Sequence, residues 1–189
     1  MRIISGLNKG KKLIMPNDKT TRPLRDMAKE SIFNILTHAK YINFHIKDCK
    51  VLDLFSGIGS FGLECISRGS KFVFFLENYA PVLKILKINI SNLKYENKSK
   101  VMEIDAFKIN NNTFKDNQKF QIIFCDPPYK ERKIELLIEK IIEMDVLEKN
   151  GIIIIHRKEG VPGTYPNKFE VIEKKNYGLS TFIFGRKNS

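Results

Sequence analysis

The sequence has no long hydrophobic run. None of its apolar stretches approaches the roughly 20 residues that a membrane-spanning helix requires, and the chain does not start with an apolar signal segment. We therefore expect a cytoplasmic protein with no membrane partner. Its 189 residues, of which 42% are hydrophobic, suffice for one domain with a substantial core and an extension.

Cysteine and histidine are also scarce, with three of each in the chain. Cys49, Cys65 and Cys125 form no CxxC pair and lie near no cluster of histidines, which argues against a zinc site or a disulfide framework. We interpret them as partly buried thiols of a reducing compartment and expect no bound metal. The histidines are spread along the chain, and we interpret each, His156 included, as structural or solvated.

Acidic residues are outnumbered. Lysine and arginine total 33 against 21 acids, which gives a formal net charge of +12 and a pI near 9.6. Residues 1–50 hold 11 basic and 4 acidic side chains, a net of +7, whereas residues 101–150 hold 8 and 10, a net of −2. This distribution favours a polyanionic partner, nucleic acid before an anionic membrane surface. General lysine enrichment, for solubility or from genome composition, is the alternative.

Short apolar segments alternate with amphipathic segments from Val51 onward. The predicted strands, most of them continuously apolar, are Val51–Phe55, Lys71–Glu77, Val101–Ile104, Gln121–Cys125 and Ile152–His156. Helices are predicted over Phe61–Ser67, Pro81–Leu93 and Ile134–Val146, and a finishing hairpin over Lys168–Lys174 and Leu179–Phe184. This order predicts a doubly wound α/β fold, with a central, mostly parallel sheet and an antiparallel last strand.

Residues 1–48 precede this alternation and are rich in basic side chains. Residues 1–15 combine apolar pairs with Gly-Lys turns and predict a small hairpin. Residues 20–36 predict a helix, with Pro23 in its first turn and an apolar stripe along one face. We therefore predict a basic N-terminal extension of hairpin and helix, residues 1–48, and a second domain, residues 49–189.

The first predicted strand of the second domain leads directly into a glycine-rich loop, "LDLFSGIGSFGLE". Gly57, Gly59 and Gly62 match G-x-G-x-x-G, in which small residues let a cofactor approach the start of a helix. Glu77 ends the next strand twenty positions after Gly57, where a carboxylate can accept both hydrogen bonds of a ribose diol. The pattern indicates a nucleoside cofactor in a Rossmann-like fold, and a tightly packed turn is the alternative.

Two further acids favour a cationic cofactor. Asp53 lies four residues before Gly57, where an anion is poorly placed beside a pyrophosphate but suits the amino and sulfonium groups of S-adenosylmethionine. Asp105 follows the third predicted strand and is placed to accept a hydrogen bond from the adenine amino group. A nicotinamide oxidoreductase is the alternative, although it needs a hydride-handling residue that the sequence does not offer.

The fourth predicted strand of the sheet ends in "DPPY". Pro127 and Pro128 carry no backbone N–H, so they end the strand ladder and form a rigid corner. Ligands bind beyond the carboxyl ends of strands in such sheets, so this corner is expected to face the glycine loop. The Asp126 carboxylate and the Pro127 carbonyl can accept the two protons of an exocyclic amine on a base. Tyr129 offers a ring on which an extruded base can stack.

These motifs resemble those of adenosylmethionine-dependent amino methyltransferases, which carry D/N-P-P-Y/F at this place. Among them the chain resembles the RsmD family, through "MRIISG", "TRPLRDMAKESIFNIL", "VLDLFSGIGSFGLECISRG", "FFLE" and "DPPY". The resemblance covers nearly the whole chain, and the N-terminal block is its discriminating part. It implies a Rossmann-like class I methyltransferase fold and methylation of the 2-amino group of a guanine, guanine 966, in 16S ribosomal RNA, within a small-subunit particle.

The resemblance also implies roles for individual residues. S-adenosylmethionine is expected to be held by Asp53, Ser56, Gly57, Gly59, Glu77, Asp105 and Ala106, and catalysis to rest on Asp126, Pro127, Pro128 and Tyr129. The chain is too short for a separate target-recognition domain, so the basic extension is expected to hold the RNA, foremost through Lys9, Lys11, Lys12, Arg22 and Arg25. Methylation of adenine or cytosine in RNA or DNA and a non-catalytic RNA-binding assembly factor are the alternatives.

Overall fold

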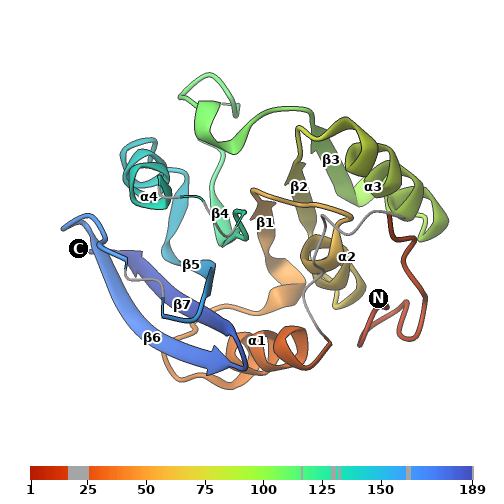
Figure 1. Ribbon diagram of the computed structural model, residues 1–189, viewed down its shortest axis with the longest axis horizontal. Coiled ribbons are helices and arrows are strands. Elements are labelled where there is room, and N and C mark those ends of the chain that lie inside the picture. Colours follow the sequence, from red (N-terminus) through yellow and green to blue (C-terminus); the bar gives the residue numbers. More distant parts are fainter. Residues whose placement is uncertain (17–25, 116, 129–130, 132, 161–162, 189) are drawn as a thin grey trace.

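A seven-stranded sheet forms the centre of the computed structural model, which describes residues 1–16, 26–115, 117–128, 131, 133–160 and 163–188 (Figure 1). The strands are β1 (Lys50–Asp53), β2 (Phe72–Leu76), β3 (Ser99–Met102), β4 (Phe120–Cys125), β5 (Leu147–Lys158), β6 (Phe169–Tyr177) and β7 (Ser180–Lys187). Their order in the sheet is β3-β2-β1-β4-β5-β7-β6, with β1 to β5 parallel and β7 antiparallel to both of its neighbours. The predicted fold, a class I methyltransferase fold, is confirmed.

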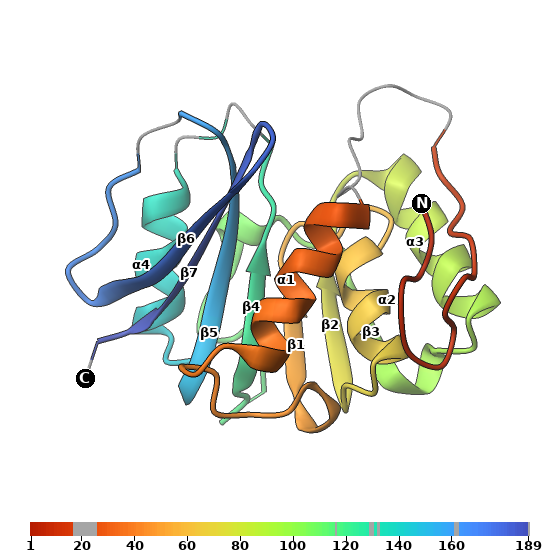
Figure 2. The same ribbon diagram turned by 90° about the horizontal axis from the view of Figure 1, so that it is seen from below.

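Helices cover both faces of the sheet. They are α1 (Asp26–His38), α2 (Ser60–Ser67), α3 (Ala80–Asn92) and α4 (Ile134–Glu143), with short 3₁₀ helices at Ile46–Asp48, Glu96–Lys98 and Ala106–Lys108. One hydrophobic cluster joins α1, α2 and α3 to one face, and a second joins α4 to the other (Figure 2). Strands with apolar side chains on both faces are buried by this arrangement, which explains their continuous apolar sequences.

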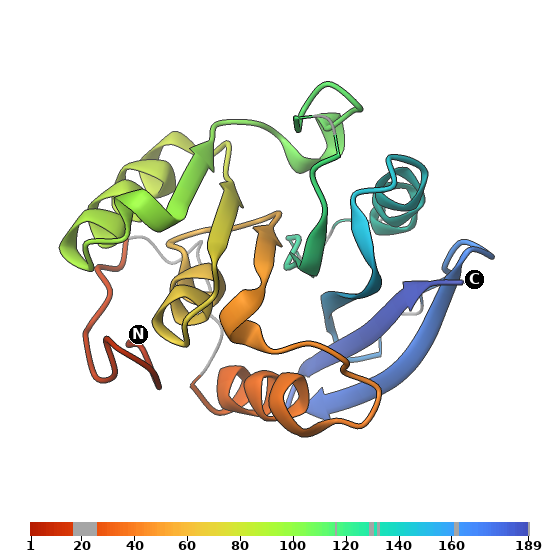
Figure 3. The same cartoon turned by 180° about the vertical axis from the view of Figure 1, so that it is seen from behind.

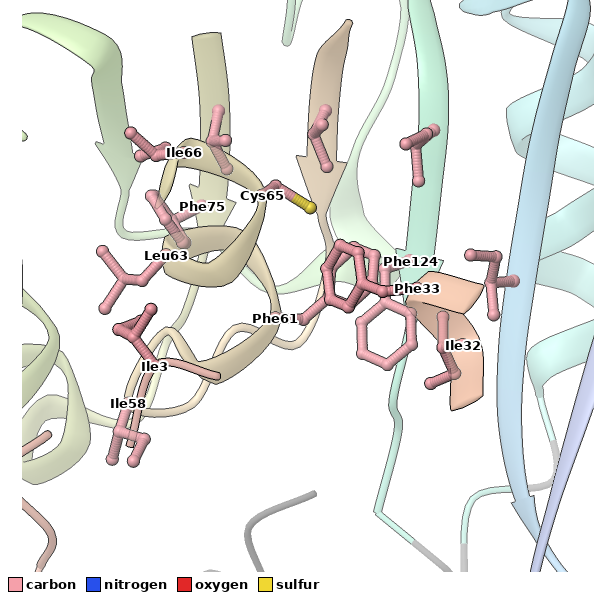
Figure 4. Close-up of a cluster of buried hydrophobic side chains, with 14 of the residues drawn as sticks. Ile3, Ile32, Phe33, Ile58, Phe61, Leu63, Cys65, Ile66, Phe75 and Phe124 are labelled. Carbon is pink, nitrogen blue, oxygen red and sulfur yellow. The ribbon is translucent and has the colours of Figure 1, made fainter. Parts of the chain in front are cut away.

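Stacked aromatic rings join α1 to the sheet. The Phe61 ring of α2 lies 4.0 Å from the Phe124 ring of β4, and the Phe33 ring of α1 lies 5.3 Å from Phe61 (Figure 4). Ile32 and Leu36, two members of the predicted apolar stripe of α1, are also buried. The helix of the basic extension is thus part of the hydrophobic core.

The N-terminal hairpin is confirmed as a short antiparallel pair with one bridge, between Arg2 and Lys12. Its Ile3 and Leu13 side chains are buried, and it lies beside α2 and α3 (Figures 1 and 3). The Glu64 carboxylate of α2 accepts two backbone N–H bonds from the hairpin, at 2.7 and 2.9 Å. These bonds fix the hairpin on the helix that follows the glycine loop.

Some predicted details differ from the structure. β5 starts at Leu147, five residues before the predicted strand, because Leu147 also pairs with Phe120 of β4, and a register shift then separates this pair from the pairing of Ile122 with Ile152. All three cysteines are fully buried, and not partly buried as expected. Pro23 lies outside the described residues. Within the described residues, no helix combines the length and apolar character that crossing a membrane requires.

Candidate active site

The two central strands bring the candidate residues to one edge of the sheet. Asp53 at the end of β1 is in register with Phe124 of β4, and the Leu54 N–H donates to the Phe124 carbonyl at 2.9 Å. Because β1 and β4 are parallel neighbours, their carboxyl ends lie at the same edge of the sheet. The predicted placement of the glycine loop and of Asp126 after neighbouring strands is therefore confirmed.

Asp53 is almost completely buried, with 1% of its surface exposed. Its Oδ2 atom accepts the Gly62 N–H at 3.1 Å, whereas Oδ1 has no hydrogen-bond partner among the described residues. Burial raises the pKa of Asp53 to about 8; the Gly62 bond opposes this shift, and the charges of Asp126 and Glu77 add to it. The carboxyl groups of Asp53, Asp126 and Glu77 are therefore close enough to affect one another electrostatically. A cation at Oδ1 would stabilise the ionised form of Asp53.

The three glycines of the loop have different surroundings. Gly57 and Gly59 have positive φ angles, +53° and +87°, which favour glycine. A Cβ atom on Gly57 would meet no atom within 4 Å, whereas one on Gly59 would lie 2.6 Å from Leu86, and one on Gly62 only 2.2 Å from the Phe75 ring. Gly59 and Gly62 thus permit close packing, while Gly57 faces open space.

Glu77 and Ser56 fix the shape of this loop. Glu77 follows β2, and its two carboxylate oxygens accept the N–H groups of Gly57 at 2.9 Å and Tyr79 at 2.8 Å. The Ser56 hydroxyl donates to the carbonyls of Asp53 and Leu76, at 2.8 and 3.1 Å. Each oxygen of Glu77 retains a second lone pair, so the carboxylate can still accept a hydrogen bond from a ligand.

Asp105 and Ala106 follow the carboxyl end of β3, next to two aromatic rings. Asp105 caps the 3₁₀ helix Ala106–Lys108 by accepting the Phe107 N–H at 2.9 Å, and Ala106 is buried. The Phe107 ring lies 5.5 Å from the ring of Phe55, which follows β1 by one residue of loop. Phe55 and Phe107 were not expected as site residues, although both follow the ends of strands that carry predicted site acids.

Asp126 begins the "DPPY" corner and keeps 25% of its side chain exposed. Pro127 is buried and Pro128 is exposed, and the Pro128 carbonyl accepts the Glu131 N–H at 2.9 Å. Tyr129 lies outside the described residues. The corner thus combines a partly accessible carboxylate, that of Asp126, with a buried proline as the next residue.

A histidine that the sequence did not single out contacts Asp126. His156 Nδ1 lies 2.7 Å from Asp126 Oδ1, and the imidazole is buried. The interpretation of His156 as structural or solvated overlooked this contact. A signal was present: His156 is the first polar residue after the apolar run of β5, and Cys125 pairs with Ile155, so the next residues of both strands lie side by side.

The basic residues predicted to bind RNA are described only in part. Lys9, Lys11 and Lys12 are exposed on the hairpin. Arg22 and Arg25 lie outside the described residues. The exposed lysines therefore belong to a hairpin that is fixed against α2 by its buried side chains, Ile3 and Leu13, and by its two N–H bonds to Glu64.

Comparisons with known proteins identify the family. A family model described as "Conserved hypothetical protein 95" matches residues 1–186. Bacillus subtilis YlbH, assigned as an rRNA methyltransferase, is 34% identical over 189 residues, 99% of each chain. Ribosomal RNA small subunit methyltransferase D of Haemophilus influenzae is 33% identical over 186 residues, 96% of this chain and 91% of the relative. The chain belongs to the RsmD family of methyltransferases.

The structural comparison agrees with this membership. The solved structure of Escherichia coli yhhF, assigned as a methyltransferase, superposes on this RsmD-family chain with a TM-score of 0.83. The two share 25% of their residues, and the match covers 100% of this chain and 98% of the other. The extension and the sheet therefore both belong to the shared RsmD-family architecture.

Proposed function

We propose that this chain transfers a methyl group from S-adenosylmethionine to the 2-amino group of a guanine in 16S ribosomal RNA, guanine 966 by family resemblance. The observation that carries the proposal is the position of Asp126, directly after β4, at the same edge of the sheet as Asp53 and the open face of Gly57. The names of its RsmD-family relatives support ribosomal RNA as the substrate.

The residues around the glycine loop fit S-adenosylmethionine. The Oδ1 atom of buried Asp53, which no described residue contacts by a hydrogen bond, offers a partner for the cationic end of the molecule, and the open face of Gly57 leaves room beside it. Glu77 would accept hydrogen bonds from the ribose, and Asp105 from the adenine amino group, beside the rings of Phe55 and Phe107. The bound molecule supplies an electrophilic methyl carbon on a positively charged sulfur.

Asp126 and its neighbours would position the guanine amine. An exocyclic amine is a poor nucleophile because its lone pair is delocalised into the ring. When the Asp126 carboxylate and the Pro127 carbonyl accept hydrogen bonds from its two N–H groups, the nitrogen becomes more tetrahedral and its lone pair points at the methyl carbon. The N–C bond would form as the carbon–sulfur bond of S-adenosylmethionine breaks, with its electron pair kept by the sulfur of the departing S-adenosylhomocysteine, and a proton would then leave the nitrogen toward Asp126 or solvent. Positioning and charge complementarity supply most of the rate.

Guanine offers a pattern of donors that suits an aspartate. Its N1–H and amino N–H are adjacent, and a carboxylate can accept both in parallel, whereas an amide cannot. The lysines of the hairpin would hold the RNA by phosphate contacts, which add affinity without reading the sequence.

Nucleoside analysis of the product tests this proposal. The protein is incubated with labelled S-adenosylmethionine and unmodified small-subunit particles, and the RNA is then digested to nucleosides. We expect label in N2-methylguanosine, at one position when the RNA is mapped. Label in methylated adenosine or cytidine would support the other amino acceptors. RNA binding without cofactor affinity would support an assembly factor.

A further inference from the structure

The His156 imidazole is enclosed at the back of the candidate active site. It is 5% exposed and lies 4.5 Å from the Phe182 ring, with an interplanar angle of 14°. Its Nδ1 atom is 2.7 Å from Asp126 Oδ1, and its Nε2 atom is 2.8 Å from the Ser180 hydroxyl. A chain of polar groups therefore runs from β7 through β5 to the corner after β4.

The register of three strands creates this chain. His156 pairs directly with Phe182 across β5 and β7, so their rings stack on one face of the sheet. The next residue, Arg157, donates from Nη1 to the Glu131 carbonyl at 2.9 Å. Two neighbouring residues of β5 therefore contact the segment that contains the two prolines. His156 contacts Asp126 before the prolines, and Arg157 contacts Glu131 after them.

We propose that His156 is a positioning residue for methyl transfer, an inference that rests on the proposed function. A neutral imidazole donates from one nitrogen and accepts at the other. Donation from Nδ1 holds one oxygen of the Asp126 carboxylate, so that the other is directed to the amine. Because the Asp126 carboxylate only accepts, it selects the tautomer with the proton on Nδ1, and the Ser180 hydroxyl, which can donate or accept, then donates to Nε2. An Asp126 side chain without this contact would sample other rotamers.

Two substitutions separate positioning from packing. In His156→Asn the amide nitrogen takes the place of Nδ1 and keeps a donor to Asp126, whereas His156→Leu keeps only bulk. We expect His156→Leu to lower kcat about 100-fold with little change in the KM for cofactor or RNA. His156→Asn should recover most of that loss. Normal kcat in His156→Leu, or an equal loss in both variants, would overturn the proposal.

The tautomer of His156 tests the same proposal without any activity. Long-range proton–nitrogen NMR of the free protein is expected to show a proton on Nδ1 in the wild type. In Asp126→Ala that tautomer should no longer dominate. A proton held on Nε2 in both proteins would overturn the assignment. If the wild type shows the expected tautomer but methylates no guanine in small-subunit RNA, only the proposed function has failed.

A second surface lies at the opposite ends of the strands. A cavity of about 450 Å³ is lined by Lys50, Lys71, Lys100 and Lys115, by Phe72 and Phe74, and by three other residues. None of its described lining residues is acidic. Lys50 and Phe72 are the first residues of β1 and β2, and Lys71 directly precedes β2, so this cavity is remote from the loop after β1 that carries Gly57.

The connection between β3 and β4 leaves this part of the sheet open. Its described residues contain one 3₁₀ helix, Ala106–Lys108, and no α-helix. The Phe74 ring is held edge-on by Phe114 at 6.2 Å and Phe120 at 5.3 Å, and the Lys100 ammonium lies 6.0 Å from its centroid. Partly exposed rings among cations are a combination that binds stacked bases and phosphates.

From this independent observation we infer that the cavity binds a single-stranded segment of RNA away from the methylated base. Lysine would contact phosphate and phenylalanine would stack on a base, and the four lysines provide charge complementarity. This inference also concerns the proposed RNA substrate, but its test does not require methyl transfer.

Salt-dependent binding of a fluorescent oligoribonucleotide provides the test. Replacing Lys50, Lys71 and Lys100 by glutamine should weaken binding and reduce the slope against salt by about 2, since each single-stranded phosphate contact contributes about 0.7. The matched control replaces Lys149, Lys168 and Lys174, all exposed on the β5–β7 side. Phe72→Ser should weaken binding without changing the slope. An unchanged affinity and slope, or an equal effect in the control, would overturn the inference.

Discussion

The Glu64 carboxylate lies 3.5 Å from the Lys29 ammonium, and both side chains are fully buried. The Arg68 guanidinium also donates to Glu64, at 2.8 Å. Burial lowers the pKa of Lys29, and the attraction of Glu64 opposes this shift. Because Glu64 also accepts two N–H bonds of the hairpin, one carboxylate connects α1, α2 and the N-terminal segment.

Removing this charge should therefore destabilise the protein and release the hairpin. Glu64→Gln leaves the buried Lys29 without its counter-ion, a change that typically costs about 3–5 kcal/mol. We expect a lower free energy of unfolding in denaturant and faster hydrogen exchange at the amides of Ile4 and Ser5. Glu143→Gln, at an exposed position of α4, is the control and should change neither. Wild-type exchange at Ile4 and Ser5 in Glu64→Gln would contradict this account of the anchor.

Binding of S-adenosylmethionine should release a proton near neutral pH. The pKa of Asp53 is raised to about 8, so below that pH its carboxyl group is mostly protonated in the free protein. A cation beside Oδ1 lowers this pKa, because it stabilises the charged form. Affinity should therefore increase as the pH rises toward about 8 and then level off.

Calorimetry in two buffers of different ionisation enthalpy measures this proton release directly. Asp53→Asn cannot release a proton and should bind with an enthalpy that does not depend on the buffer. Affinity of the wild type that is flat between pH 6 and pH 8 would show that Asp53 does not face the cation.

Gly57 and Gly62 should respond differently to the same substitution. Gly57→Ala places a methyl group in the open crevice, at a positive φ that costs about 1–2 kcal/mol, and should raise the Kd for S-adenosylmethionine about 10-fold or more. Gly62→Ala drives a methyl group into the Phe75 ring, and such overpacking costs about 1–3 kcal/mol. It should lower the unfolding temperature and leave the Kd of the folded protein nearly unchanged. A normal Kd in Gly57→Ala together with a raised Kd in Gly62→Ala would contradict the roles assigned to the two glycines.

The hairpin lysines should contribute a measurable salt dependence to RNA binding. Replacing Lys9, Lys11 and Lys12 by glutamine is expected to weaken binding and reduce the salt slope by about 2–3, since each duplex phosphate contact contributes about 0.9. The hairpin should stay folded, because Ile3 and Leu13 remain buried. The control is the same exposed triple used above, Lys149, Lys168 and Lys174. An unchanged slope would mean that the hairpin lysines are only a solvated surface.

The fold was predictable because its signals are local. Strands buried on both faces need continuous apolar runs, and the helices between them need an apolar stripe, as in Ile134, Leu137, Ile138 and Ile141 of α4. The placement of Asp53 and Asp126 at one edge of the sheet was predictable without side-chain detail, because the carboxyl ends of neighbouring parallel strands share an edge. The start of β5 was missed because a polar stretch and a register shift separate Leu147, which pairs with Phe120, from the apolar run that starts at Ile152.

The contacts between buried polar and charged side chains were not predictable in the same way. The pairing of His156 with Asp126 depends on the register of β4 and β5 and on the return of β7, which brings Ser180 to the ring. The burial of Lys29 and Glu64 depends on how α1 and the hairpin close over α2. Such contacts join residues far apart in sequence, and the position of His156 after an apolar run indicates its partner only once the register of β4 and β5 is known.

Methyl transfer by Asp126→Ala tests the central claim most directly. We expect the rate at saturating cofactor and RNA to fall about 100- to 1000-fold, because the amine loses the acceptor that orients its lone pair. Binding of S-adenosylmethionine should stay largely intact. Asp48→Ala, at an exposed acid before β1, is the matched control and should be fully active. A normal rate of transfer to guanine by Asp126→Ala would contradict the account.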